Sequence, residues 1–371
     1  FTLPFKAGRL RFSVLGYETK TVSVKEVADS LVFRLKSLDR SLGTAEVTGK
    51  KTKYSRKNNP AVELMRKVIA AKKSSDLHQH DYYSIDKYSK ITFALNDVTD
   101  KVFEEGKFKK LPFLKDHVEV CNETGKLILP LSVDETVTRL IYRKEPKSEK
   151  NIILGQRSNG INDLLNTGDI VNTMLKDCFT DVDIYNDEVR LLQYPFTSPI
   201  SSRTAISFYR YFIVDTLMVD GKQRCIQVDF TPNNPQDFGF SGSLYIMADG
   251  TYRVYKADMG IPVRSDVNFV QSMRIIQTFD QLPTGEQVLV KDNMLVQLHI
   301  TKSAGKFQVK RDTEYSNFAF EPIPDKTFKF KGETLTSANA QMQDEHFWQE
   351  HRADSLTKSE STMKQLIKKL E

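Results

Sequence analysis

The stretch YFIVDTLMVDGKQRCIQVDFTPNNPQDFGFSGSLYIMADG, residues 211–250, decides the fold. It contains three apolar runs of strand length, and an Asp-Gly dipeptide follows the first and the third of them. Asp-Gly tolerates positive φ at both central positions of a type I′ turn, so Asp220-Gly221 and Asp249-Gly250 predict two β-hairpins. Successive hairpins indicate an antiparallel meander.

Apolar residues alternate with polar ones in this stretch, and strand residues two apart share one face of a sheet. Ile226, Val228 and Phe230 therefore lie on one face of their strand, and Leu244 and Ile246 lie on one face of the next. The meander thus presents a continuous apolar surface. Two interpretations stay open: helices fill that surface as a solid core, or a gap remains that accepts an acyl chain.

A helix that can cover this surface is predicted in NNPAVELMRKVIAAKKSS, residues 58–75. Asn59 suits the N-cap, and Pro60 suits the first helical position. The apolar residues recur at helical spacing and form one stripe, which is typical of a helix packed on a sheet. We expect Leu64, Val68 and Ile69 to face the apolar surface.

Several other segments show strand or helix patterns. Residues 82–98 alternate with a period of two, residues 125–144 predict a hairpin, and residues 293–320 predict another hairpin that turns near Gly305. Residues 161–179 predict a mostly helical segment. The fold class that follows is α+β, with mainly antiparallel β structure.

Length and charge limit the range of functions. A chain of 371 residues suggests two or three domains. The net charge is +6, but 54 basic residues are interleaved with 48 acidic ones, so we expect no nucleic-acid partner. The densest basic run, GKKTKYSRKNN at residues 49–59, is interpreted as a solvated linker; the alternative is a polybasic segment that faces an anionic membrane surface.

Motifs that carry chemistry are missing or ambiguous. There is no GxSxG, HExxH, Walker A or GxGxxG pattern, and GFSGS at residues 239–243 is interpreted as a strand entering a turn. His78 and His80, with Asp76 and Asp81 nearby, offer two imidazoles and a carboxylate for zinc, but no third ligand is evident and a solvated loop is the favoured interpretation. We expect no catalytic residue, no metal site and no cofactor. The cysteines are interpreted as buried small apolar residues: Cys121, Cys178 and Cys225.

Several blocks together resemble a family of outer-membrane proteins. FSVLGYETKTVSV resembles the end of a carboxypeptidase-regulatory-like domain, which is a transthyretin-like β sandwich. The blocks NNPAVELMRKVIAAKKSS, FTSPISSRTAISFYRYFIVDT, IQVDFTPNNPQDFGFSGSLYI and FWQEHRADSLTKSE are similar to later parts of the same family, in the same order. In that family an uncharacterised periplasmic domain and a membrane β-barrel follow the regulatory-like domain. No histidine here begins the HxxE pattern of zinc carboxypeptidases, so we expect no peptidase activity.

The resemblance implies a partial transthyretin-like sandwich followed by a curved sheet like that of lipoprotein carriers, a half barrel with covering helices. The domains it implies are the end of the regulatory-like domain at 1–40, a basic linker at 41–58, the curved-sheet domain at 59–325 and a charged helical tail at 326–371 that leads to the barrel. The tail is expected to form a helix from Ser361 to Leu370 that is poorly anchored without the barrel.

The function that this resemblance implies is a non-enzymatic module on the periplasmic face of the outer membrane. It would bind a lipid, a lipoprotein or a protein partner in envelope transport or assembly, and its partners would include its own barrel and other outer-membrane proteins. The alternative is an envelope hydrolase that acts on glycan or peptide, for which the sequence shows no recognisable catalytic motif. Acidic pairs such as Asp181 with Asp183 could do acid and base work on a sugar, but they are interpreted as exposed turn residues. The predicted ligand-cavity residues are Leu64, Val68, Ile69, Ile226, Val228, Phe230, Leu244 and Ile246.

Overall fold

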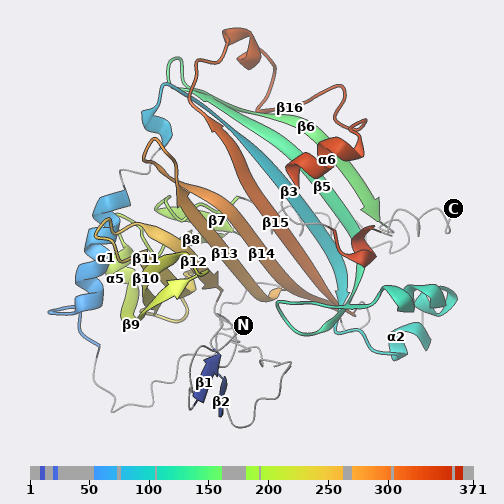
Figure 1. Ribbon diagram of the computed structural model, residues 1–371, viewed down its shortest axis with the longest axis horizontal. Coiled ribbons are helices and arrows are strands. Elements are labelled where there is room, and N and C mark those ends of the chain that lie inside the picture. Colours follow the sequence, from blue (N-terminus) through green and yellow to red (C-terminus); the bar gives the residue numbers. More distant parts are fainter. Residues whose placement is uncertain are drawn as a thin grey trace.

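The computed structural model describes most of the chain, and its main feature is one large curved sheet (Figure 1). The described residues are 9–12, 20–23, 54–72, 77–104, 107–160, 181–191, 194–261, 270–301, 305–352 and 356–361. The predicted helix at 161–179 and most of the predicted helix at 361–370 lie outside them.

The large sheet is unclosed, and its strand order is β16-β6-β5-β3-β15-β14-β13-β12-β11-β10-β9, with β4 paired to β5. All neighbours are antiparallel except β16 and β6, which are parallel. The bounds of its first six strands are β3 (Tyr82–Asn96), β4 (Glu119–Val120), β5 (Leu127–Arg143), β6 (Ser148–Gly160), β9 (Tyr209–Val219) and β10 (Gln223–Pro232). The others are β11 (Ser241–Met247), β12 (Val254–Gly260), β13 (Val270–Gln281), β14 (Gln287–Thr301), β15 (Gly305–Ala319) and β16 (Thr334–Thr336). The antiparallel α+β prediction is confirmed.

Short elements surround the sheet. Two antiparallel pairs form separate two-stranded sheets: β1 (Arg9–Phe12) with β2 (Lys20–Ser23), and β7 (Glu188–Leu191) with β8 (Tyr194–Thr197). The described helices are α1 (Pro60–Ala71), α2 (Lys101–Glu104), α5 (Ala205–Phe208) and α6 (Glu345–His351). The 3-10 helices are η3 (Leu77–Gln79), η4 (Lys107–Lys110), η5 (Pro112–His117) and η6 (Asp325–Phe328). No described helix has the length and apolar character that a membrane span needs.

The start of helix α1 agrees with the sequence. The side chain of Asn59 accepts a hydrogen bond from the Ala61 N–H at 2.9 Å, and Pro60 occupies the first helical position. One stripe of the helix is buried, and its members are Ala61, Val62, Leu64, Met65 and Val68. Local capping and apolar spacing together determine this element, which is why the prediction is confirmed.

The two Asp-Gly turns differ from each other. Asp220 and Gly221 have φ values of 53° and 67°, as a type I′ turn requires. In the second turn Gly250 has a positive φ but Asp249 does not, Tyr252 also has a positive φ of 57°, and six residues separate Met247 from Val254. The prediction of a type I′ turn there is wrong, because the Asp249 carboxylate accepts the Thr251 N–H at 2.9 Å and stabilises a longer loop.

The predicted hairpin at residues 125–144 is also wrong, because these residues form the single strand β5. Pro130 lies inside this strand although proline has no N–H to donate within a ladder. The structure places a β-bulge there, where the pairing of β3 with β5 skips Leu131. The bulge accommodates the proline, and the chain turns instead at residues 144–147, between β5 and β6.

Candidate functional site

The eight predicted cavity residues come together in one apolar cluster on one face of the sheet, which we call the inner face. Val228, Phe230, Leu244 and Ile246 are fully or almost fully buried, as are Leu64 and Val68 of α1, whereas Ile69 and Ile226 are half-buried. The register pairs Ile226 with Ile246 and Val228 with Leu244. The predicted shared face is therefore observed, and α1 lies against it.

The inner face is covered by several separate elements. The cluster includes Met65 of α1, Leu114 of η5, Val189 of β7, Phe196 of β8 and Ala205 of α5. Only short elements, rather than a second large sheet, contribute these cover residues. One pocket touches Val68 at the edge of α1 and leaves no room for a water-sized molecule. The buried members of the apolar cluster pack together between α1 and the sheet.

Polar contacts hold the margins of the helix. The Lys72 ammonium lies 3.0 Å from the Asp187 carboxylate, and the Lys67 ammonium lies 3.4 Å from the Tyr252 hydroxyl. Both contacts are at least partly open to water, where such pairs contribute about 0–1 kcal/mol. The attachment of α1 to the sheet thus depends mainly on its apolar stripe.

A polar island interrupts the inner face where residues 181–185 cross it. Asp292 and Arg311 form a buried ion pair at 2.5 Å, and the Gln277 amide donates to the Val182 carbonyl at 2.7 Å. Burial raises the pKa of Asp292, although Arg311 and Gln277 act in the opposite direction. These bonds tie residues 181–185 to the sheet.

The opposite face, which we call the outer face, carries a groove of about 670 Å³. Charged side chains line it, and most of them are already paired. Lys256 lies 2.9 Å from Asp220, and Lys310 lies 2.6 Å from Glu123. The Arg274 guanidinium lies 2.7 Å from the Asp258 carboxylate. The lining of this groove mixes charged side chains with apolar ones such as Ile276, Val290 and Leu295, and it does not involve the predicted cavity residues.

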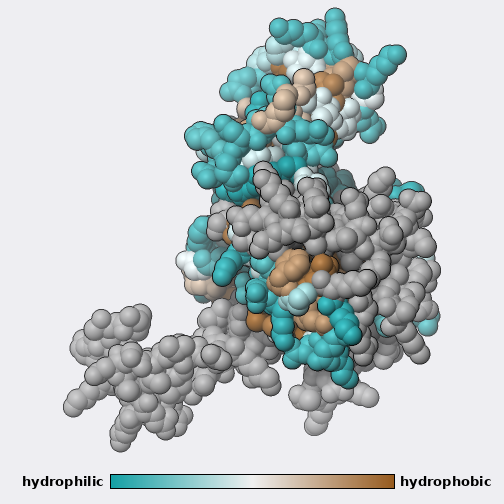
Figure 2. Space-filling view, turned by 90° about the vertical axis from the view of Figure 1, so that its right-hand side faces the viewer, coloured by the Kyte–Doolittle hydropathy of each residue, from teal (hydrophilic) through white to brown (hydrophobic). Residues whose placement is uncertain are grey.

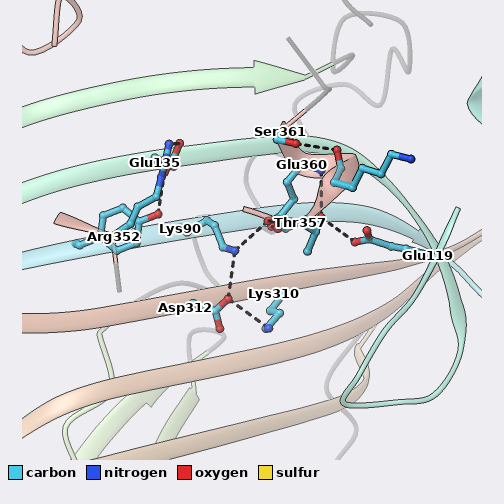
Figure 3. Close-up of polar contacts among 12 residues, drawn as sticks. Lys90, Glu119, Glu135, Lys310, Asp312, Arg352, Thr357, Glu360 and Ser361 are labelled. Atoms are coloured by element: carbon cyan, nitrogen blue, oxygen red, sulfur yellow. Dashed lines mark hydrogen bonds and ion pairs between the residues drawn. The ribbon is translucent and has the colours of Figure 1, made fainter. Parts of the chain in front are cut away.

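The C-terminal segment, by which we mean residues 345–352 and 356–361, lies on the outer face and is held by buried charges (Figure 3). Glu135 is fully buried, and its carboxylate accepts from Arg157 and Arg352 at 2.5 Å each and from the Tyr88 hydroxyl at 2.8 Å. Trp348 of α6 is buried beneath the Arg157 guanidinium, which lies 4.6 Å from the ring centroid. Figure 1 shows α6 across the long strands.

A second buried pair fixes the end of this segment. Lys90 lies 3.1 Å from Glu360 and 4.0 Å from Asp312, and the Thr92 hydroxyl donates to Glu360 at 2.8 Å. Figure 3 shows Lys90 between the strand β15 and the C-terminal segment. Burial raises the pKa of Glu360, but Lys90, the Thr357 N–H and Thr92 outweigh burial and hold this pKa below its usual value of 4.5.

Acid is expected to release residues 356–361 from the outer face. A carboxyl whose pKa is lowered by folding contributes stability that is complete above its unfolded pKa and is lost as the pH falls through its folded pKa. The protection factor of the Thr357 amide, whose N–H donates to Glu360 at 2.9 Å, should therefore fall below about pH 4.5. In Lys90→Met this loss of protection should begin at higher pH. A protection factor that does not change with pH in either protein would contradict this prediction.

The histidines of the HQH motif diverge. His78 lies 3.5 Å from Glu149 and packs edge-on to Tyr142, whereas His80 lies 2.8 Å from Glu286 and contacts Phe320. Within the described ranges, no group of three or more His, Cys, Asp or Glu side chains is placed to hold a metal ion. Cys121 and Cys225 are buried free thiols, and Cys178 lies outside these ranges.

The GFSGS motif belongs to the packing of the sheet. A Cβ on Gly242 would lie 2.0 Å from the carbonyl oxygen of Asp258 on the neighbouring strand, so β11 approaches β12 too closely for any side chain. The Ser241 hydroxyl lies 3.1 Å from the Thr231 hydroxyl. On the side shown in Figure 2, the coloured surface is mostly hydrophilic, with hydrophobic residues in small patches.

Comparisons with known proteins give one family and distant structural likenesses. A family model described as "Family of unknown function (DUF5686)" matches residues 64–318, which is more than half of the chain. Among curated proteins, none matches the chain.

Three solved structures are similar at low TM-scores. The LolA superfamily protein NE2245 from Nitrosomonas europaea has 11% identity and a TM-score of 0.24, covering 73% of this chain and 97% of that chain. The MucA/MucB complex of Pseudomonas aeruginosa has 9% identity and a TM-score of 0.19, covering 71% of this chain and 100% of that chain. A structure titled as lipid-protein interactions in lipovitellin has 9% identity and a TM-score of 0.22, covering 65% of this chain and 26% of that chain.

Proposed function

We propose that this chain, which belongs to the DUF5686 family of unknown function, is a non-enzymatic binding module at the periplasmic face of the outer membrane. We propose further that it holds an acyl chain between helix α1 and the inner face of the sheet. The observation that carries this proposal is the apolar interior of an unclosed sheet, which is covered by short separate elements.

The cover can move at modest cost compared with a second sheet. Helix α1 is twelve residues long, and two partly exposed polar contacts hold its margins. An acyl chain that enters beneath it would replace the contacts of the apolar stripe with contacts of its own. The filled interior therefore becomes a binding site only when α1 is displaced, so binding and helix movement are one event.

Simple energetics limit the affinity. Each buried methylene contributes about 0.8 kcal/mol, so about ten contribute about 8 kcal/mol. That value corresponds to a dissociation constant of about 1 μM before the cost of immobilising the ligand. We therefore expect micromolar or weaker binding.

The test is a titration of the full delipidated chain with a fluorescent fatty acid, with thermal melting to monitor folding. Saturable binding is expected, and Ile226→Glu should abolish it because an unpaired carboxylate would enter the apolar site. Arg224→Glu, on the same strand at an exposed position, is the matched control and should bind as the wild type does. If Ile226→Glu fails to fold, Ile69→Glu at the half-buried end of α1 replaces it.

Two outcomes would reject the acyl-chain site. One is an absence of saturable binding by well-folded wild-type protein. The other is binding that a folded Ile226→Glu or Ile69→Glu variant leaves unchanged, because the fatty acid would then lie elsewhere.

A further inference from the structure

Strand β9 ends the large sheet and leaves one long edge open. In the order of the described strands β9 pairs with β10 alone, and it runs for eleven residues. The strand at the opposite end, β16, has three residues. An edge strand presents a row of N–H and C=O groups that can pair with another chain, and proteins usually shorten or charge such edges. The length of β9 is therefore unusual for an unprotected edge.

The exposed side chains of β9 are apolar on both faces. Exposed fractions are 41% for Phe212, 45% for Ile213, 53% for Val214 and 56% for Met218. Neighbouring strand residues point to opposite faces of a sheet, so Phe212 and Ile213 expose apolar side chains on both faces at this edge. A helix that lay on one face would cover only one of them. A strand added in the plane of the sheet would contact both.

Residues 211–219 lack the usual protective residues. They contain no lysine, arginine or proline. The one charged residue is Asp215, and its carboxylate accepts the N–H of Thr216 at 2.7 Å. A β-bulge at Val214, where the pairing of β9 with β10 passes from Ile213 directly to Asp215, is the one other protective feature in this stretch.

The beginning of the edge already makes a contact of the kind that an added strand would make. The Tyr211 N–H donates to the Tyr54 hydroxyl at 3.1 Å, and the Tyr54 ring lies 5.4 Å from that of Phe212. The hydroxyl thus takes the place of a strand carbonyl. Because N–H directions alternate along a strand, the Ile213 N–H points to the same open side.

Two cations flank this end of the edge. Arg56 donates to the carbonyls of Ile206 and Ser207 at 2.8 and 2.6 Å, and Arg210 donates to Asn233 at 2.9 Å. Within the described part of the chain, both guanidinium groups donate to uncharged oxygens. An acidic residue on the occupant would complement them.

We propose that β9 is a docking edge that adds an extended strand of a partner protein, antiparallel to residues 212–218. The partner strand carries apolar side chains at the centre and acidic residues at its C-terminal end, which meets Arg56 and Arg210. Backbone hydrogen bonds supply affinity, and the alternating side chains supply specificity. This surface is the hydrogen-bonding edge of β9, whereas α1 packs on the face of the same strand, so the proposal does not require that an acyl chain binds.

The test uses the full chain and a fluorescent peptide of alternating valine and threonine that ends in aspartate and glutamate. Saturable binding is expected, together with slower amide exchange at residues 212–218. Ile213→Pro removes an N–H on the open side, and Val214→Lys adds a protective charge; each should weaken binding at least about tenfold. Met342→Lys, at a position that is 74% exposed away from β9, is the matched control and should bind normally.

The same experiment separates the other occupants. Thermal melting establishes whether each variant is folded. If Ile213→Pro is not folded, Val214→Lys, at an exposed site, carries the test in its place. An absence of peptide binding by folded wild-type protein would overturn the proposal, as would binding that both edge variants leave intact. A dimer in sedimentation equilibrium that Val214→Lys dissociates would assign the edge to a second copy and would also overturn it.

Discussion

Replacing Glu135 by alanine is expected to lower the free energy of unfolding by about 3–5 kcal/mol, because breaking a buried ion pair leaves its partners uncompensated. Glu135 is fully buried and holds Arg157, Arg352 and Tyr88. Without the carboxylate, two guanidinium groups lose their buried acceptor. Urea unfolding followed by Trp348 fluorescence measures the loss, and this residue is the one tryptophan of the chain.

The matched control is Glu63→Ala. Glu63 also pairs with an arginine, Arg66, but at 3.7 Å and with both side chains largely exposed. An exposed pair contributes about 0–1 kcal/mol, so this variant should unfold near the wild-type midpoint. A loss below about 1 kcal/mol in Glu135→Ala would contradict the account of the outer face.

Replacing Met65 by alanine is expected to destabilise the fold by about 2–5 kcal/mol, because the change leaves a cavity beneath α1. Met65 is fully buried in the centre of the apolar stripe. If the interior accepts an acyl chain, the vacated volume should let a fatty acid bind more tightly, and saturating fatty acid should recover much of the lost stability. Urea unfolding with and without fatty acid measures both effects.

Arg66→Ala, on the exposed side of the same helix, is the control for Met65→Ala. It should change stability by less than about 0.5 kcal/mol and should leave fatty-acid binding unchanged. A Met65→Ala protein that is destabilised as expected but gains nothing from fatty acid would indicate a closed core rather than a ligand site.

Local rules in the sequence predicted the elements that form the inner face. Asn59 and Pro60 determine the start of α1 through contacts within a few residues. The alternation in β10 and β11 predicted that Ile226 and Ile246 share a face, and the register pairs them directly. Periodicity suffices for such elements because each residue's environment follows from its neighbours in the sequence.

The outer face could not be predicted in the same way. Asp86, Tyr88, Lys90 and Thr92 alternate along β3 as the polar residues of a solvated face would. They are buried instead, because the C-terminal segment covers them, and Lys90 meets a carboxylate 270 residues away in the sequence. An alternation of polar residues shows which side chains lie on the same face of a strand, but it does not show which segment covers that face.

The bulge at Pro130 illustrates a third case. A proline inside an apolar run normally favours a turn, and the sequence carries no signal that a β-bulge will accommodate it.

The tail also differs from its expected structure. A charged helical tail was expected at 326–371, and within the described residues it forms η6, the short strand β16, α6 and one turn at residues 358–361. Contacts with β6 and β5 determine those conformations.

Photocrosslinking of a diazirine-labelled fatty acid to the full wild-type chain, followed by peptide mapping, tests the acyl-chain site most directly. The account predicts labels on α1 near Leu64 and Ile69 and on β10 and β11 between Ile226 and Ile246, with competition by unlabelled fatty acid. Labels confined to the outer-face groove near Arg274 and Lys310, or labelling that excess unlabelled fatty acid does not reduce, would contradict it.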